Sequence, residues 1–260
     1  MQLCLDVGNS HIFGGIFDGT DLSLRFRHPT ALHSTSDELG IFLKTVLREN
    51  NIDLSNITDI GISSVVPSLD YSLRSACIKY FNINPLFINA DIKTGLTIQI
   101  DNPHELGADL ICDAVAASQH FPSKNIIIIS MGTATTYSAI SKNREFLGVS
   151  ISPGMRLSME ALQGNTAKLF AVEIKKPTSV LGKNTTASIQ SGLYFGQLGV
   201  FRELTQRISE EYFTDDSPII IGCGGFSQLF EKEGVFTAWM PDLILQGLKH
   251  ILDLNRGLTA

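Results

Sequence analysis

Hydrophobic and polar positions alternate along the chain in blocks that predict strands and helices in turn. Short apolar or alternating runs bounded by turn residues predict strands at 2–6, 12–17, 59–65, 85–88, 96–100, 125–130, 135–140 and 218–221. Apolar residues at helical spacing predict helices at 34–49, 68–80, 102–121 and 200–212, and a last one that begins at 241. Strands and helices that alternate in this way predict an α/β fold.

A short internal repeat divides the chain into two similar halves. Gly8 lies in a strand–turn–strand segment, and Gly132 lies in a segment of the same character 124 positions later. A third glycine turn, Gly222–Gly225, follows the strand that ends at Ile221. We therefore expect an N-terminal half, 1–115, and a C-terminal half, 116–260, whose glycine turns face a cleft suited to a nucleotide.

Composition and charge exclude several classes of protein. The 260 residues are 43% hydrophobic and 18% charged, enough for a substantial core, and the formal net charge is −6. No basic run is present, which argues against a nucleic-acid partner. The longest aliphatic run is Ile126–Ile129, so we expect no membrane span. No signal-peptide core is seen and the four cysteines form no CxxC pair, which predicts reduced thiols and a cytoplasmic location.

Two glycine turns are candidates for binding phosphate. Asp6–Ser10 offers backbone N–H donors without an obstructing side chain, and Asp6 could orient a hydrated Mg²⁺. Taken alone, the same residues are more typical of an ordinary Gly-Asn hairpin turn. Gly132–Thr136 offers small hydroxyl side chains for phosphate, although a threonine-rich strand is an equally good interpretation.

A candidate catalytic acid lies on the predicted helix after Pro103, where Asn102 and Glu105 are typical helix-start residues. Glu105, Asp109 and Asp113 are spaced i, i+4, i+8, which predicts one acidic stripe. Such a stripe is usually a solvated face. Asp109 stands out as a possible general base because the small residues Gly107 and Ala108 precede it.

The segment Lys183–Thr186, which follows Gly182, offers a cation and two hydroxyls. These groups could help a net-acidic protein to hold a polyanion. An exposed loop without a binding role is the more common case for such a segment.

Taken together and in this order, the motifs resemble those of the type III pantothenate kinases along nearly the whole chain. The matching segments are Asp6–Ser10, Ser63–Pro67, Lys93–Leu96, Asn102-Pro103, Gly107–Asp109, Gly132–Tyr137, Ser152–Gly154, Gly182–Thr185, Gln190–Gly192, Gly224-Gly225 and Leu245–Leu248. Each is weak alone, and the ordered set is specific.

The resemblance implies a duplicated acetate and sugar kinase/Hsp70/actin fold, related to ribonuclease H, with two halves around a nucleotide cleft. It implies MgATP-dependent phosphorylation of pantothenate, the first committed step of coenzyme A synthesis, by a homodimer with sites near its interface. Asp109 would be the catalytic base. The ATP-binding positions would be Asp6, Val7, Gly8, Asn9, Ser10 and Thr133, with Gly224 and Gly225 on the adenosine side. The substrate-binding positions would be Gly107, Ala108, Asp109 and Thr185.

Three positions depart from the family pattern. Ile100 and Leu110 stand where the family usually has a tyrosine and an arginine that contact substrate, and Ser130 stands where it has the aspartate that binds K⁺ or NH₄⁺. A serine hydroxyl is a poorer cation ligand than a carboxylate, so we expect cation activation to be lost. The departures leave open two alternatives: a silent, regulatory nucleotide-binding relative, or a kinase for another small hydroxylated substrate.

Overall fold

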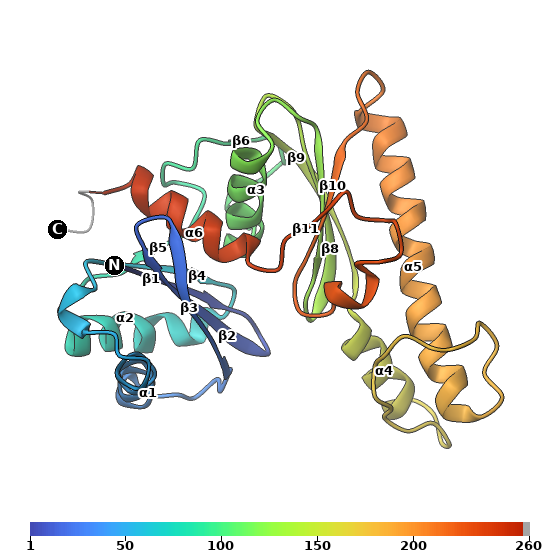
Figure 1. The fold of residues 1–260 in the computed structure, drawn as a ribbon, viewed down its shortest axis with the longest axis horizontal. Helices are drawn as coiled ribbons and strands as arrows, with labels where there is room; N and C mark the ends of the chain where they lie inside the picture. The colour runs from blue at the N-terminus through green and yellow to red at the C-terminus, as the bar shows by residue number, and fades with distance from the viewer. Residues whose placement is uncertain (257–260) are drawn as a thin grey trace. The chain divides into compact units, whose positions relative to one another are not determined.

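The computed structural model describes residues 1–256, which form two sheets with helices packed on them (Figure 1). The strands are β1 (Gln2–Val7), β2 (His11–Asp18), β3 (Asp21–Pro29), β4 (Asp59–Ser64), β5 (Leu86–Phe87), β6 (Thr97–Ile98), β7 (Ile126–Met131), β8 (Ala134–Ile140), β9 (Glu145–Pro153), β10 (Ile219–Cys223) and β11 (Ala238–Trp239). The α-helices are α1 (Ser36–Glu49), α2 (Pro67–Phe81), α3 (Ala108–His120), α4 (Met155–Gly164), α5 (Thr185–Tyr212) and α6 (Leu243–Leu254). Single 3₁₀ turns are η1 (Leu54–Asn56), η2 (Pro103–Glu105) and η3 (Ser227–Phe230).

The two sheets repeat one strand order. In the first sheet the order is β3-β2-β1-β4-β5, with β1–β2 and β2–β3 antiparallel and β1–β4 parallel. In the second, the strands β9-β8-β7-β10-β11 follow the same order, and the corresponding pairs have the same directions. The repeat seen around Gly8 and Gly132 is therefore the visible part of a duplication that includes whole sheets.

The chain folds as two compact units, 1–116 with 243–260, and 117–242. The sequence placed the first division after residue 115, and it placed the last helix with the second half. In the structure α6 packs on β1 and β4 of the first unit. Two glycines allow this close packing: a Cβ on Gly61 would lie 2.9 Å from Leu252 of α6, and a Cβ on Gly247 would lie 1.9 Å from the Cys112 carbonyl oxygen of α3.

The core of the first unit follows from alternation along β1. Leu3, Leu5 and Val7 are fully buried on the face that α1 and α2 cover. The intervening residues, Asp6 among them, face the opposite side. Helix α1 begins with a capping box between Thr35 and Glu38.

The core of the second unit is built on α5 and one face of its sheet. Tyr137 of β8 packs edge-on to Phe201 of α5 with ring centroids 6.2 Å apart, and Phe201 packs on Phe230 at 5.0 Å. The Gln197 side chain donates a hydrogen bond of 2.9 Å to the Tyr137 hydroxyl, so this buried polar pair is satisfied.

Several elements differ from those expected from the sequence. Strands β3 and β9, the short β11 and helix α4 were not predicted, and α5 begins at Thr185, where a loop was expected. Helix α2 begins at Pro67, one residue before the predicted start, and has no side-chain cap. The expected helix from Asn102 is broken: Asn102 caps the 3₁₀ turn η2, and α3 begins only at Ala108.

The contact beneath Gly247 gives a stability prediction. Replacing Gly247 with alanine forces α6 away from the α3 backbone, so we expect the melting temperature to fall by about 5 °C or more. Gly199 is the control, because a Cβ there meets nothing within 4 Å and alanine is the better helix former. Gly199→Ala should raise the melting temperature slightly in the same thermal denaturation assay. A Gly247→Ala protein as stable as the original would contradict the packing argument.

Candidate active site

Asp6 lies on β1, between β2 and β4 in the sheet of the first unit. Asp6 is in register with Ser63 of β4 on one side and Phe13 of β2 on the other. The Ser63 hydroxyl donates a hydrogen bond of 3.1 Å to the Asp6 carboxylate. Burial raises the pKa of Asp6 well above its usual value, the negative charges of Asp109 and Asp113 raise it further, and the Ser63 hydrogen bond acts in the opposite direction.

Asp109 is the second residue of α3, and its position is set by its neighbours. The Leu110 backbone N–H donates a hydrogen bond of 2.9 Å to the Asp109 carboxylate. A Cβ on Gly107 would lie 2.4 Å from the same carboxylate oxygen, so any larger residue there would displace it. Burial raises the pKa of Asp109, and the backbone hydrogen bonds lower it in part. The Gly-Ala-Asp motif therefore leaves room for a partly buried carboxylate at the start of a helix.

Of the three acidic residues expected to share one helix, two lie on α3 and one does not. Glu105 belongs to η2, apart from α3, and its carboxylate accepts a hydrogen bond of 2.9 Å from the Asn102 side chain. Asp109 and Asp113 lie one turn apart on α3. Asp113 is only 4% exposed, so this side of the helix is not the solvated face that such a pattern usually indicates.

The Asp6–Ser10 turn is fastened from its carbonyl side. The Thr30 N–H donates to the Ser10 carbonyl at 3.0 Å, and the Thr30 hydroxyl donates to the Gly8 carbonyl at 2.6 Å. Asn9 and Ser10 are exposed, whereas Val7 is fully buried in the core. Val7 can thus serve a nucleotide only through its backbone.

The second unit gathers another set of the expected residues at the β7–β8 turn. A Cβ on Gly154 would lie 2.4 Å from the Thr133 carbonyl oxygen, and a Cβ on Gly224, whose φ is +84°, would lie 2.6 Å from that of Met131. Thr133 is exposed in this turn, and a Cβ on Gly225 would meet nothing within 4 Å. Gly154 and Gly224 therefore pack directly against the turn that carries Thr133.

Ser130 lies near the end of β7 between two neutral residues. It is in register with Thr136 of β8 and with Cys223 of β10. The Thr136 hydroxyl is buried without a hydrogen-bond partner. Hydroxyl and thiol groups therefore stand side by side in this row, and none of these three side chains is a carboxylate.

Thr185 is the first residue of α5, a 28-residue helix. The Asn184 side chain caps the helix by accepting a hydrogen bond of 2.9 Å from the Ala187 N–H. Gly182 lies against the same turn, since a Cβ there would be 2.2 Å from the Ser188 nitrogen. Thr185 is exposed at a helix N-terminus, which favours anionic ligands.

The expected site residues thus fall into separate groups. Asp6–Ser10 and Gly107–Asp109 belong to the first unit, whereas Thr133, Thr185 and the Gly224-Gly225 pair belong to the second. Of the two departures expected at the substrate, Leu110 is buried in α3 and Ile100 is partly buried after β6. Neither side chain can donate a hydrogen bond.

The residues near Asp6 fit a hydrated magnesium ion. The Asp6 carboxylate supplies the hard oxygen atoms that Mg²⁺ prefers, and a cation there would offset the negative charges of Asp109 and Asp113 that raise the pKa of Asp6. In the part of the chain that the structure describes, no group of three or more acidic, histidine or cysteine side chains is arranged to hold a metal ion by itself. This arrangement suits an ion that keeps most of its waters and shares phosphate oxygens.

Comparisons with known proteins show which family the chain belongs to. The sequence pattern of type III pantothenate kinase matches residues 2–207. The chain belongs to this family. A type III pantothenate kinase of Legionella pneumophila (strain Corby) is 57% identical over 255 residues, covering 98% of this chain and 99% of the relative. Type III pantothenate kinase 1 of Francisella tularensis subsp. holarctica (strain OSU18) is 48% identical over 256 residues, covering 98% and 100%.

Solved structures confirm the expected fold. A protein described as a 2-dehydro-3-deoxygalactonokinase from Sinorhizobium meliloti matches with a TM-score of 0.62 at 11% identity, covering 100% of this chain and 98% of that one. A protein from Campylobacter jejuni, described as a Baf family transcriptional activator, matches with a TM-score of 0.57 at 19% identity, covering 97% and 98%. At such identities the likeness concerns the fold alone, and it is the fold of the sugar kinases.

Among the described helices, none has the length and apolar character needed to cross a bilayer.

The raised pKa of Asp6 has a consequence for stability. Between the unfolded value, near 4, and the higher folded value, the folded chain holds a proton that the unfolded chain has released. Stability therefore falls as the pH rises through this interval. Asp6→Asn removes the charge and keeps an acceptor for Ser63, so we expect it to raise the melting temperature at pH 7.5, with the gain disappearing near pH 4.

Asp53 provides the matched control for this measurement. The Ser55 N–H lowers the pKa of Asp53, so its charged form stabilises the fold and Asp53→Asn should lower the melting temperature at pH 7.5. Thermal denaturation of both variants at the two pH values tests the sign. An Asp6→Asn protein less stable than the original at pH 7.5 would show that the carboxylate is not under electrostatic stress.

Proposed function

We propose that this chain transfers the γ-phosphate of ATP to the primary hydroxyl of pantothenate. The observation that carries the proposal is the group of carboxylates in the first unit. Gly107 leaves space for the Asp109 carboxylate, the Leu110 N–H donates a hydrogen bond to it, and its charge raises the pKa of Asp6. Family membership supports the choice of substrate, since the relatives that cover the chain are type III pantothenate kinases.

Asp109 is proposed as the general base. Phosphoryl transfer depends mainly on alignment and charge neutralisation, so the base has only to accept the hydroxyl proton as the new O–P bond forms. A pKa raised by burial makes the carboxylate a stronger base than an exposed aspartate, while the backbone hydrogen bonds keep it oriented. The hydroxyl proton would pass to an oxygen of the Asp109 side chain.

Asp6 is proposed to orient the magnesium ion that accompanies ATP, through a bound water. When present, the ion neutralises phosphate charge during the transfer. The part played by the chain is to hold Asp6 in place: Ser63 donates to its carboxylate, and β1 fixes its backbone between β2 and β4.

The nucleotide would be held by backbone groups and small side chains. We assign phosphate contacts to the turn Gly8–Ser10, which Thr30 fastens, and to Thr133. Gly224 and Gly225 are proposed on the adenosine side. Gly225 supports this assignment because the space above it is open.

The residues proposed to bind the substrate are Gly107, Ala108, Asp109 and Thr185. Thr185 lies at the N-terminus of a long capped helix, which suits an anionic substrate. We also propose a homodimer with sites near its interface. Val180 and Leu181, exposed by 62% and 81%, lie just before Thr185 and would be covered by a second copy.

A cytoplasmic location is proposed as well. The four cysteines, Cys4, Cys77, Cys112 and Cys223, are all free and buried. Unpaired thiols are usual in a reducing compartment.

The role of Asp109 can be tested directly. Asp109→Asn should lower kcat with pantothenate at least 100-fold, because the amide cannot accept the proton, while ATP binding is retained. Glu105→Gln is the control, since Glu105 lies in the preceding 3₁₀ turn and should leave kcat within about twofold. A coupled assay of ADP release with and without pantothenate measures both.

The same assay separates the proposed function from its alternatives. ATP binding without turnover in the unaltered protein would indicate a silent regulatory relative. Turnover with other small polyols, but not with pantothenate, would indicate a different substrate.

The monovalent cation gives a separate prediction. Since Ser130 and its neighbours in the row are neutral, we expect equal turnover in K⁺ and Na⁺ salts. Ser130→Asp adds a carboxylate at this position, so we expect it to introduce stimulation by K⁺ or NH₄⁺. Initial rates at constant ionic strength test this, and strong K⁺ activation of the unaltered protein would contradict it.

A further inference from the structure

An exposed arginine lies at the edge of the first sheet, in the same row as Asp6. The strand register pairs Asp6 with Phe13 and Phe13 with Arg27 of β3, so the three residues share one face of the sheet. Neighbouring strands are about 4.8 Å apart, which places the backbone of Arg27 roughly 10 Å from that of Asp6. Phe13 lies between the two residues in this row.

Phe13 fixes the direction of the Arg27 side chain. The guanidinium carbon lies 4.0 Å from the centre of the Phe13 ring, and Phe13 itself is buried. Because Phe13 stands between Arg27 and Asp6 in the row, this cation–π contact holds the guanidinium on the Asp6 side of β3. Stacking on a ring leaves the N–H groups at the edge of the guanidinium available for an anion.

Electrostatics support a role at the acidic site. The positive charge of Arg27 lowers the pKa of Asp6, against the larger effects of burial, Asp109 and Asp113. No ion pair joins Arg27 to any carboxylate in residues 1–256. The guanidinium is therefore a positive group held in one orientation near these carboxylates. A polyanionic ligand bound there would be repelled by the carboxylates and attracted by the guanidinium.

The chain also connects Arg27 to the phosphate turn. Three residues after Arg27, Thr30 donates its N–H to the Ser10 carbonyl and its hydroxyl to the Gly8 carbonyl. Arg27 and the Gly8–Ser10 turn are thereby fixed relative to each other within one unit. A phosphate group bound at this turn would lie within reach of a side chain as long as that of arginine.

We propose that Arg27 binds the terminal phosphates of ATP, as a phosphate-binding residue that works with the Gly8–Ser10 turn. The inference rests on the proposed use of ATP. A bidentate guanidinium–phosphate contact adds positive charge that the neutral turn does not supply, and it opposes the repulsion between phosphate and the carboxylates.

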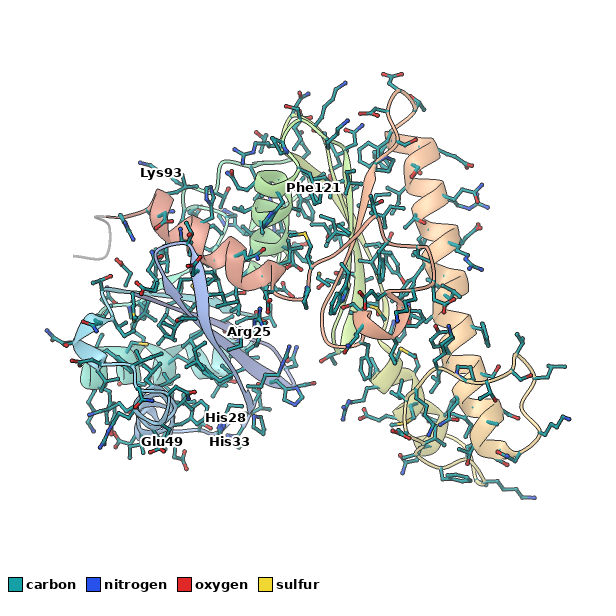
Figure 2. All side chains as sticks on the ribbon, viewed as in Figure 1. Arg25, His28, His33, Glu49, Lys93 and Phe121 are labelled. Carbon is teal, nitrogen blue, oxygen red and sulfur yellow. The ribbon has the colours of Figure 1, made fainter. Side chains whose placement is uncertain are left out.

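Arg25 is the matched control. It lies on the same face of β3 two residues earlier, in register with Gly15, and it is labelled in Figure 2. Gly15 is paired with Cys4, and a Cβ on Gly15 would lie 2.8 Å from Leu245 of α6, so this row is covered by α6. Loss of the Arg25 charge should therefore have little effect on phosphate binding.

The test is titration calorimetry of the full chain with a non-hydrolysable ATP analogue, ADP and AMP, each in the presence of Mg²⁺. For Arg27→Met we expect binding of the ATP analogue at least tenfold weaker and binding of AMP within twofold of the original protein. Arg27→Lys should recover part of the loss, and Arg25→Met should bind all three ligands within twofold. Equal melting temperatures establish that the variants are folded.

Two results would overturn the assignment: unchanged binding of the ATP analogue by Arg27→Met, or an equal loss for the ATP analogue and AMP. Absence of nucleotide binding by the unaltered protein would overturn it together with the proposed function. If the unaltered protein binds the analogue but does not phosphorylate pantothenate, the proposed function fails, and the calorimetry still decides the role of Arg27.

Discussion

The repulsion among three carboxylates on one side of the first unit is the constraint on which the rest of the site depends. Asp6 lies on strand β1, and Asp109 and Asp113 lie on helix α3 of the same unit. Their negative charges raise the pKa of Asp6, and burial adds to the cost of these charges. The fold could relieve this stress with neutral residues and gain stability. It instead keeps these carboxylates buried, and buried titratable groups with raised pKa values are typical of functional sites.

Glycines determine how closely the elements around these carboxylates can approach. Gly107 leaves space for the Asp109 carboxylate, and Gly247 lets α6 lie on the α3 backbone. In the second unit Gly154 and Gly224 do the same for the turn that carries Thr133. The motifs around these glycines are therefore packing requirements as much as ligand contacts, because a single methyl group at any of them would move a functional residue or a helix.

Much of the fold could be predicted from local pattern, and the failures share a physical cause. The hairpins that turn at Gly8 and Gly132 were found because each begins with an apolar strand and continues in a strand of apolar and β-branched residues. Strand β3 was missed because its outward residues are mostly polar or charged and it ends at Pro29. Strand β9 was missed because its exposed residues, Ser150, Ile151 and Pro153, do not alternate regularly with buried apolar ones. Each of these strands is defined by pairing with the preceding strand across a hairpin turn, which periodicity along one segment does not reveal.

Candidate site residues could be predicted where neighbouring residues in one short motif set their position. They could not be predicted where their position depends on how strands pair. Asp109 was found because Gly107 precedes it. Glu105 was wrongly placed on the same helix, because helical spacing does not reveal the break between η2 and α3. Arg27 was missed altogether, since its relation to Asp6 depends on two successive strand pairings and is invisible along the chain.

The two charged residues missing from the family pattern balance each other. Leu110 replaces a positive side chain and Ser130 replaces a negative one, so together they leave the net charge of the chain unchanged. The structure places both replacements in surroundings that tolerate them: Leu110 is buried in α3, and Ser130 stands beside Thr136 and Cys223. Leu110, the residue next to Asp109, carries no positive charge that could attract phosphate. Arg27 is placed to supply it, because Phe13 orients its guanidinium and Thr30 ties its strand to the phosphate turn.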